Sequence, residues 1–124
     1  MTTIAVVADD LIWASRLTDA VRRAGAESRR LGGAAATDEV TVAALGCAGA
    51  IVDTALVTAE PIAVITALAA AGLPVLAVAD HDDVGLRKRA LAAGAGKVLA
   101  YRKLHEDGPA VVAAWLRAMP AAVP

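Results

Sequence analysis

Short apolar runs without helical periodicity recur along the chain, and each of them ends at a carboxylate. Such runs predict strands that are buried on both faces, as in a parallel sheet. Because a charge is costly inside a buried strand, each aspartate is expected at the carboxyl end of its strand. Ligand sites of open α/β sheets lie at that edge, so the aspartates mark a candidate site. The runs are residues 4–8 before Asp9 and Asp10, 49–52 before Asp53, and 75–79 before Asp80.

An amphipathic helix is predicted directly after the first run. Trp13, Leu17 and Val21 recur at helical spacing and form its apolar face. Asp10 can cap the beginning of this helix, and Gly25 can end it. The segment that follows, residues 27–31, is polar enough to predict a strand at the edge of the sheet.

Two weaker helical signals lie on either side of the strand that ends at Asp53. The first is a helix that Thr37 or Asp38 would cap. The second begins near Thr58, whose hydroxyl is expected to cap it, and Pro61 stands where the first helical turn tolerates a proline.

The last third of the chain predicts two helices and a fifth strand. Asp82 or Asp83 is expected to cap the first of these helices. The strand is predicted at residues 97–101, and the final helix from Gly108-Pro109 onward. The helix after Asp83 carries the apolar residues Val84, Leu86 and Leu91 and is expected to end at Gly94.

Five strands that alternate with five helices indicate an α/β fold, a doubly wound five-stranded parallel sheet with right-handed crossovers. At 124 residues the chain is expected to form one domain, 1–124. No apolar run approaches the roughly 20 residues that span a bilayer, and the start does not look like a signal peptide. The single cysteine, Cys47, fits a reducing cytoplasm. A net charge of −1 and few aromatic residues argue against nucleic-acid binding.

At residues 4–10, 49–53, 73–78 and 93–95 the sequence resembles the receiver domain of bacterial response regulators, the CheY-like family. The resemblance covers essentially the whole chain, and the spacing between the first and third strand-end acids matches the family without a gap. It implies a flavodoxin-like sheet with the strand order 2-1-3-4-5. It also implies a signal-transduction module of a two-component system or phosphorelay.

Carried over residue by residue, the resemblance implies a phosphorylation site. Asp53 matches the phosphoacceptor, Asp9 matches an acid that binds Mg²⁺, and the backbone carbonyl of Ala55 matches a further ligand. Asp10 is an additional metal candidate, because it follows closely on Ala8, where the family usually has an acid. Mg²⁺ is usually held by one or two carboxylates with waters and phosphate, and it neutralises phosphoryl oxygens during in-line attack.

Several substitutions indicate an atypical receiver with an impaired site. Besides Ala8, Ala79 stands where a hydroxyl normally donates to the phosphoryl group, and Tyr101 stands where the family has a lysine. If the fifth strand continues, Lys103 lies on the same face as Tyr101. Without the lysine, the acidic edge is expected to hold a cation or to raise the pKa of one aspartate.

The favoured function is a non-enzymatic signalling module that binds a sensor kinase or a downstream signalling protein, with Asp53 phosphorylated weakly or not at all. A homodimer is a further candidate assembly, whereas nucleic acid and membranes are not expected partners. The partner-binding face is expected at six basic residues, Arg87, Lys88, Arg89, Lys97, Arg102 and Lys103.

Two other functions stay open. A flavodoxin-like domain could bind a small molecule or cofactor, although Asp9 and Asp10 would repel a phosphate group after the first strand. A cobalamin module would need its histidine there too, whereas His81 follows the fourth strand. An Asp-dependent phosphoryl-transfer enzyme would need a second aspartate where Ala55 stands.

Overall fold

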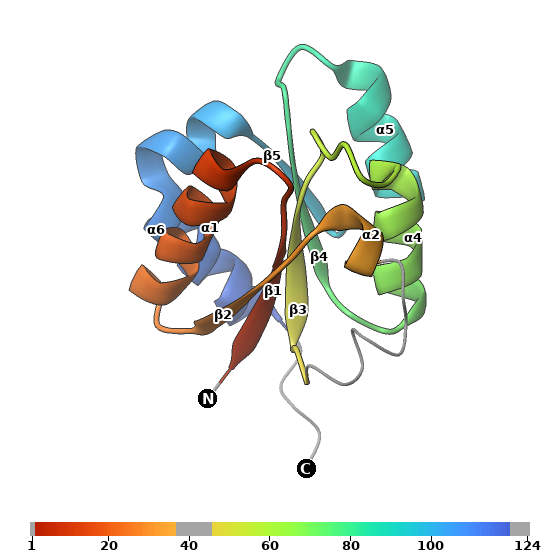
Figure 1. The fold of residues 1–124 in the computed structure, drawn as a ribbon. Coiled ribbons are helices and arrows are strands. Elements are labelled where there is room, and N and C mark those ends of the chain that lie inside the picture. The colour runs from red at the N-terminus through yellow and green to blue at the C-terminus, as the bar shows by residue number, and fades with distance from the viewer. Residues whose placement is uncertain (1, 37–45, 120–124) are drawn as a thin grey trace.

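The computed structural model describes residues 2–36 and 46–119, which form an all-parallel sheet in the order β2-β1-β3-β4-β5 (Figure 1). The predicted doubly wound sheet with strand order 2-1-3-4-5 is therefore confirmed. The strands are β1 (Thr3–Val7), β2 (Glu27–Leu31), β3 (Gly49–Asp53), β4 (Val75–Ala79) and β5 (Lys97–Ala100).

Helices cover both faces of the sheet. In Figure 1, α1 (Leu11–Arg23) and α6 (Tyr101–Ala118) lie on one face. The other face carries α2 (Gly33–Ala36), α4 (Pro61–Ala70) and α5 (Val84–Ala92). Among the described residues, no helix is both long and apolar enough to cross a membrane.

The apolar core has two layers because side chains alternate along each buried strand. Ile51 of β3 packs in the layer under α1 and α6, and its neighbour Val52 packs in the layer under α2, α4 and α5. All five residues of β3 are buried, which agrees with the uninterrupted apolar run. The same alternation directs Asp53, the last residue of β3, toward the face that α1 and α6 cover.

The predicted beginning of α1 is confirmed, whereas two other predicted helix starts differ. Asp10 caps α1 by accepting the Ile12 N–H at 2.9 Å. The cap of α4 is the Glu60 side chain and not the Thr58 hydroxyl, which bonds to a different loop. The expected cap at Thr37 or Asp38 lies outside the described residues.

The apolar residues of α5 divide between core and solvent, and Leu86 packs against the core. Val84 and Leu91 are 56% and 47% exposed, and Ala90 is the buried residue of this helix. Small residues set the contact with α4: Gly94, just after α5, has a φ of +117°. A Cβ built there would lie 2.5 Å from the Cβ of Ala69, so α5 approaches α4 through its small side chains.

Helix α6 begins earlier than the sequence predicted. The fifth strand ends at Ala100, and the helix starts at Tyr101 and bends at Asp107, whose φ and ψ are −131° and 29°. The bend divides α6 into two helical parts, and the second begins at Gly108-Pro109 as the sequence predicted, whereas the first part, from Tyr101, was not predicted. Lys103 consequently does not share a strand face with Tyr101, and its ammonium group pairs with Asp107 at 3.0 Å.

Candidate functional site

Asp53 lies at the carboxyl end of the central strand β3, as predicted, but its carboxylate is only 1% exposed. Its Oδ1 atom accepts the Ala55 N–H at 3.0 Å and the phenol O–H of Tyr101. Its Oδ2 atom is buried and has no hydrogen-bond partner among the described residues. A buried carboxylate needs donors, and here a backbone amide and a phenol supply them.

Tyr101 covers Asp53 because it begins α6 directly after β5. Its ring packs against Trp13 of α1, with centroids 4.7 Å apart and planes tilted by 56°. The Arg16 guanidinium lies 5.3 Å from the Trp13 ring centroid and donates to His105 Nδ1 at 3.0 Å. These contacts fix the phenol between the two helices.

The environment of Tyr101 favours its neutral form. Burial raises the pKa of the Tyr101 phenol most, and the hydrogen bond to Asp53 and the negative charge of that carboxylate raise it further. Tyr101 therefore acts as a neutral donor to Asp53, in the position where the resembled family has a lysine.

Asp9 is the centre of a second group of hydrogen bonds, which we call the Asp9 cluster. Its Oδ1 accepts the Gly33 N–H at 3.0 Å, and its Oδ2 accepts the N–H groups of Val57 and Thr58, both at 2.8 Å. The Thr58 hydroxyl donates to the same carboxylate at 2.9 Å. The cluster thus joins the loops that follow β1, β2 and β3.

The hydrogen bonds of the Asp9 cluster hold the carboxylate in its ionised form. Burial raises the pKa of Asp9, but the backbone amides of Gly33, Thr58 and Val57, with the Thr58 hydroxyl, lower it more, to about 2. The acidic edge was expected to hold a cation or to raise the pKa of an aspartate. The pKa of Asp9 is instead lowered, because N–H donors take the place of a cation beside the carboxylate.

The predicted Mg²⁺ ligands are not arranged as a metal site. Among residues 2–36 and 46–119, no group of three or more acidic, histidine or cysteine side chains is placed to hold a metal ion. Both Asp9 oxygens already accept N–H groups, whose positive ends would face a bound cation. Asp10 caps α1, and Ala55 donates its own N–H to Asp53. Asp53 Oδ2 has no partner among the described residues, so Mg²⁺ binding stays a prediction that requires Asp9 to release its N–H donors.

Ala8 and Ala79 directly follow Val7 and Val78, which pair with Val52 and Asp53 at the end of β3. Ala8 and Ala79 are buried at the ends of β1 and β4 and bring no polar side chain to the carboxylate. The Thr54 hydroxyl donates to the Val78 carbonyl at 2.8 Å.

The six predicted basic residues do not form one uncompensated face. Arg102 and Lys103 pair with acids one turn further along α6, at 2.8 and 3.0 Å. Arg87 donates to the Val98 carbonyl at 3.2 Å, and Lys97 begins β5. Lys88 and Arg89 are exposed on α5 and form no ion pair with another described residue.

Sequence reasoning missed two side-chain partners of the strand-end aspartates. It assigned Thr58 to a helix cap, and it did not pair Tyr101 with Asp53. Its placement of Trp13 in the core is confirmed. The one available signal for the contact between Tyr101 and Asp53 was the tyrosine at the position of the family's lysine, which can donate a hydrogen bond as a lysine does.

We expect Asp9→Asn to destabilise the chain at neutral pH by about 1 to 3 kcal/mol, because an amide turns one acceptor into a donor that faces other donors. The Asp9 pKa is lowered to about 2, so its contribution is present above the ordinary pKa of an aspartate and disappears as the pH falls toward 2. Urea unfolding at a series of pH values should show the difference from wild type shrinking in acid. Asp80→Asn, at an exposed acid of the same edge, should show no such difference.

Tyr101 is the one tyrosine of the chain, so the ultraviolet titration of tyrosinate reports it alone. We expect no ionisation near pH 10 in the folded protein, because the pKa is raised. Since the folded state favours the neutral phenol, stability should fall as the pH rises above the ordinary tyrosine pKa. Asp53→Asn, which removes the charge, should lower the pKa. A folded wild-type chain that titrates near pH 10 would contradict the contact.

No protein-family model matches the sequence, and no curated protein matches it either. Solved structures do match. A protein from Burkholderia pseudomallei that is named as related to pilus assembly has 25% identity and a TM-score of 0.76, over 96% of this chain and 90% of that one.

Two response regulator structures match over similar lengths. The receiver domain of the response regulator NarL from Mycobacterium tuberculosis has 22% identity and a TM-score of 0.73, over 94% of this chain and 97% of that one. A response regulator from Burkholderia pseudomallei, with a phosphorylated aspartic acid and a calcium ion, has 19% identity and a TM-score of 0.67. That match covers 98% of this chain and 68% of the other. The chain therefore has the fold of a response regulator receiver domain.

Proposed function

We propose that this chain is a receiver-like signalling module that acts through protein–protein contacts and does not depend on phosphorylation of Asp53. The observation that carries the proposal is the hydrogen bond from the Tyr101 phenol to a carboxylate that is only 1% exposed. A phosphoryl donor must reach the carboxylate in line, and the phenol occupies the approach to one of its oxygens.

The chemistry around Asp53 supports the same conclusion. Phosphoryl transfer depends almost entirely on positioning and on the neutralisation of developing negative charge. Ala79 offers no hydroxyl, and Tyr101 is a neutral phenol with a raised pKa where a cation would be needed. Removing one such preorganised donor typically costs roughly 2.7 to 4 kcal/mol of transition-state stabilisation.

Binding of Mg²⁺ through Asp9, Asp53 and the Ala55 carbonyl stays a prediction, and it would cost Asp9 its hydrogen bonds. Asp9 would first have to give up the N–H groups of Gly33, Val57 and Thr58. The similar response regulator from Burkholderia pseudomallei carries calcium and a phosphorylated aspartic acid. For this chain we propose that the donors described above take the place of a metal ion.

The proposed partner is another signalling protein, a sensor kinase or a downstream component, in the cytoplasm. Lys88 and Arg89 on α5 and Lys97 on β5 are exposed and form no ion pair with another described residue, which favours a partner with an acidic surface. Neither nucleic acid nor a membrane is proposed as a partner, and no catalytic activity is proposed.

The two alternatives gain no support from the site. A small-molecule function would need a hollow at the carboxyl ends of the strands, where Asp53 lies. One hollow of about 700 Å³ lies instead near Gly25 and Pro74, at the amino ends of the strands. A phosphoryl-transfer enzyme would need an open nucleophile and a second acid, and Asp53 is covered and Ala55 has no carboxylate.

Incubation with acetyl phosphate and Mg²⁺, followed by intact-mass measurement, tests the proposed function. We expect little or no phosphorylated species for the native chain. A variant that combines Ala79→Thr with Tyr101→Lys supplies the missing hydroxyl and cation, and it should gain a labelled species that the further change Asp53→Asn removes. Rapid, stoichiometric labelling of the native chain that Asp53→Asn abolishes would contradict the proposal.

The partner face is tested by charge reversal on α5. The pair Lys88→Glu and Arg89→Glu should reduce retention of the chain on immobilised polyglutamate, a probe for an acidic partner, and salt should reduce the retention of the native chain. The same reversal at Arg23 and Arg117, on α1 and α6, serves as the control and should have a smaller effect. Equal effects of both pairs would show that α5 has no special role.

A further inference from the structure

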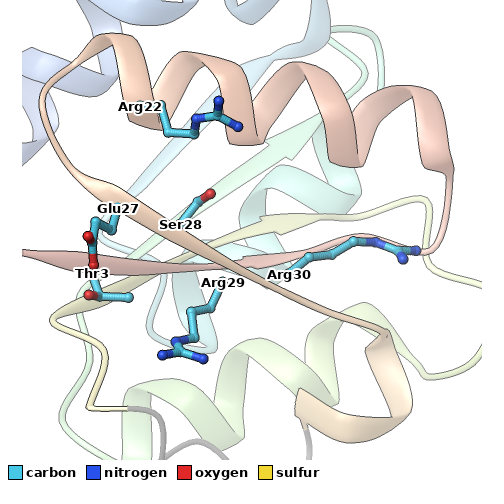
Figure 2. Close-up of a pocket in the computed structure, with 6 residues that line it drawn as sticks. All are labelled: Thr3, Arg22, Glu27, Ser28, Arg29 and Arg30. Carbon is cyan, nitrogen blue, oxygen red and sulfur yellow. The ribbon is translucent and has the colours of Figure 1, made fainter.

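Among the described residues, no strand pairs with the outer side of β2, and this edge of the sheet carries a self-complementary charge pattern. Strand β2 is the first in the sheet order, and Figure 1 shows it in front of the other strands. Figure 2 shows the side chains around it, where a hollow of about 540 Å³ follows the strand. The lining residues are Thr3, Arg22, Glu27, Ser28, Arg29 and Arg30.

The backbone of β2 has free hydrogen-bonding groups on its outer side. The Glu27 N–H donates to the Thr2 carbonyl at 2.9 Å, and the Leu31 carbonyl accepts the Ala8 N–H at 3.1 Å. In a parallel pair, alternate residues direct both backbone groups to the neighbour, so Ser28 and Arg30 direct theirs outward. Such an edge is a template for pairing with another chain.

The two edges of the sheet differ in how side chains protect them. At β5, the Arg87 guanidinium donates to the Val98 carbonyl at 3.2 Å, and Lys97 places a charge on the strand. At β2, no side chain of the described residues bonds to the strand's own backbone. Charged side chains on an edge strand commonly protect it against pairing with another strand. On β2 the charges are of both signs, so they can pair with those of a second copy.

The charges on β2 match those of a second, antiparallel copy of the same strand. Alternation puts Glu27 and Arg29 on one face of the strand and Ser28 and Arg30 on the other, and Figure 2 shows Ser28 and Arg29 extending to opposite sides. Both Glu27 and Arg29 are exposed, and neither forms an ion pair with a described residue.

We propose that two copies of this chain pair antiparallel through β2, with Ser28 opposite Ser28 of the second copy, and so join their sheets. In this register Glu27 of each copy faces Arg29 of the other. The alternative register puts Arg29 opposite Arg29, and like charges directly opposite are unfavourable. The contact is isologous, so it closes as a two-fold dimer and goes beyond the signalling role proposed above.

Backbone geometry favours the same register. Because Ser28 directs its N–H and C=O outward, the two Ser28 residues can exchange both hydrogen bonds. Glu27 and Arg29 then fall at the non-hydrogen-bonded positions, where Cα atoms of opposite residues lie about 4.5 Å apart and side chains are closest. Opposite charges at such positions stabilise a strand pair.

Charge reversal tests the dimer, with sedimentation equilibrium as the measurement. We expect a concentration-dependent dimer for the native chain. Glu27→Arg alone or Arg29→Glu alone should raise the dissociation constant by about tenfold or more, because the two-fold axis repeats each change. The double variant with both changes exchanges the charges and should restore the dimer. Lys88→Glu, which changes the same charge away from β2, should have little effect.

Disulfide cross-linking tests the register in a Cys47→Ala background, which removes the native thiol. Ser28→Cys should form an intermolecular disulfide on mild oxidation, since opposite residues lie within disulfide reach, and Arg29→Cys should not. Circular dichroism should confirm that each variant is folded. A native chain that is monomeric at all concentrations overturns the proposal, and so does efficient cross-linking of Arg29→Cys with none at Ser28→Cys.

Discussion

The site is organised by the need to supply donors to a buried carboxylate. Asp53 ends the central strand β3, where almost no solvent reaches it, so its hydrogen bonds must come from the protein. The Ala55 amide and the Tyr101 phenol supply them to Oδ1. The contact explains why α6 begins immediately after β5: the phenol must reach across the edge of the sheet to Asp53, and Trp13 of α1 supports its ring.

The same principle accounts for Asp9, with a different source of donors. Its carboxylate is ionised without a cation, because amides from the loops after β2 and β3 converge on it together with the Thr58 hydroxyl. The receiver resemblance assigns these two acids to phosphate and metal chemistry, and three of their four carboxylate oxygens accept hydrogen bonds within the chain. These internal hydrogen bonds are the physical reason for proposing a module that works without either ligand.

The sequence predicted the parts of the fold that depend on local patterns. Apolar runs located the buried strands, and Asp10 was recognised as a cap because its bond to Ile12 is local. The errors share a different cause, which is contact between distant segments. Thr58 bonds Asp9 and does not cap its own helix, and Tyr101 begins α6 and bonds Asp53 instead of ending the fifth strand. No periodicity within one segment reports such contacts.

The open edge and the site are connected through one side chain of β2. The Arg30 guanidinium donates to the carbonyls of Ala8 and Asp9, at 3.2 and 3.4 Å, and so contacts the segment that carries the Asp9 carboxylate. In the dimer that we propose, the outward backbone groups of Arg30 face the second copy. Pairing would restrict the motion of Arg30 and, through it, of the loop between β1 and α1. A second copy at β2 would therefore also restrain the segment that carries the Asp9 carboxylate.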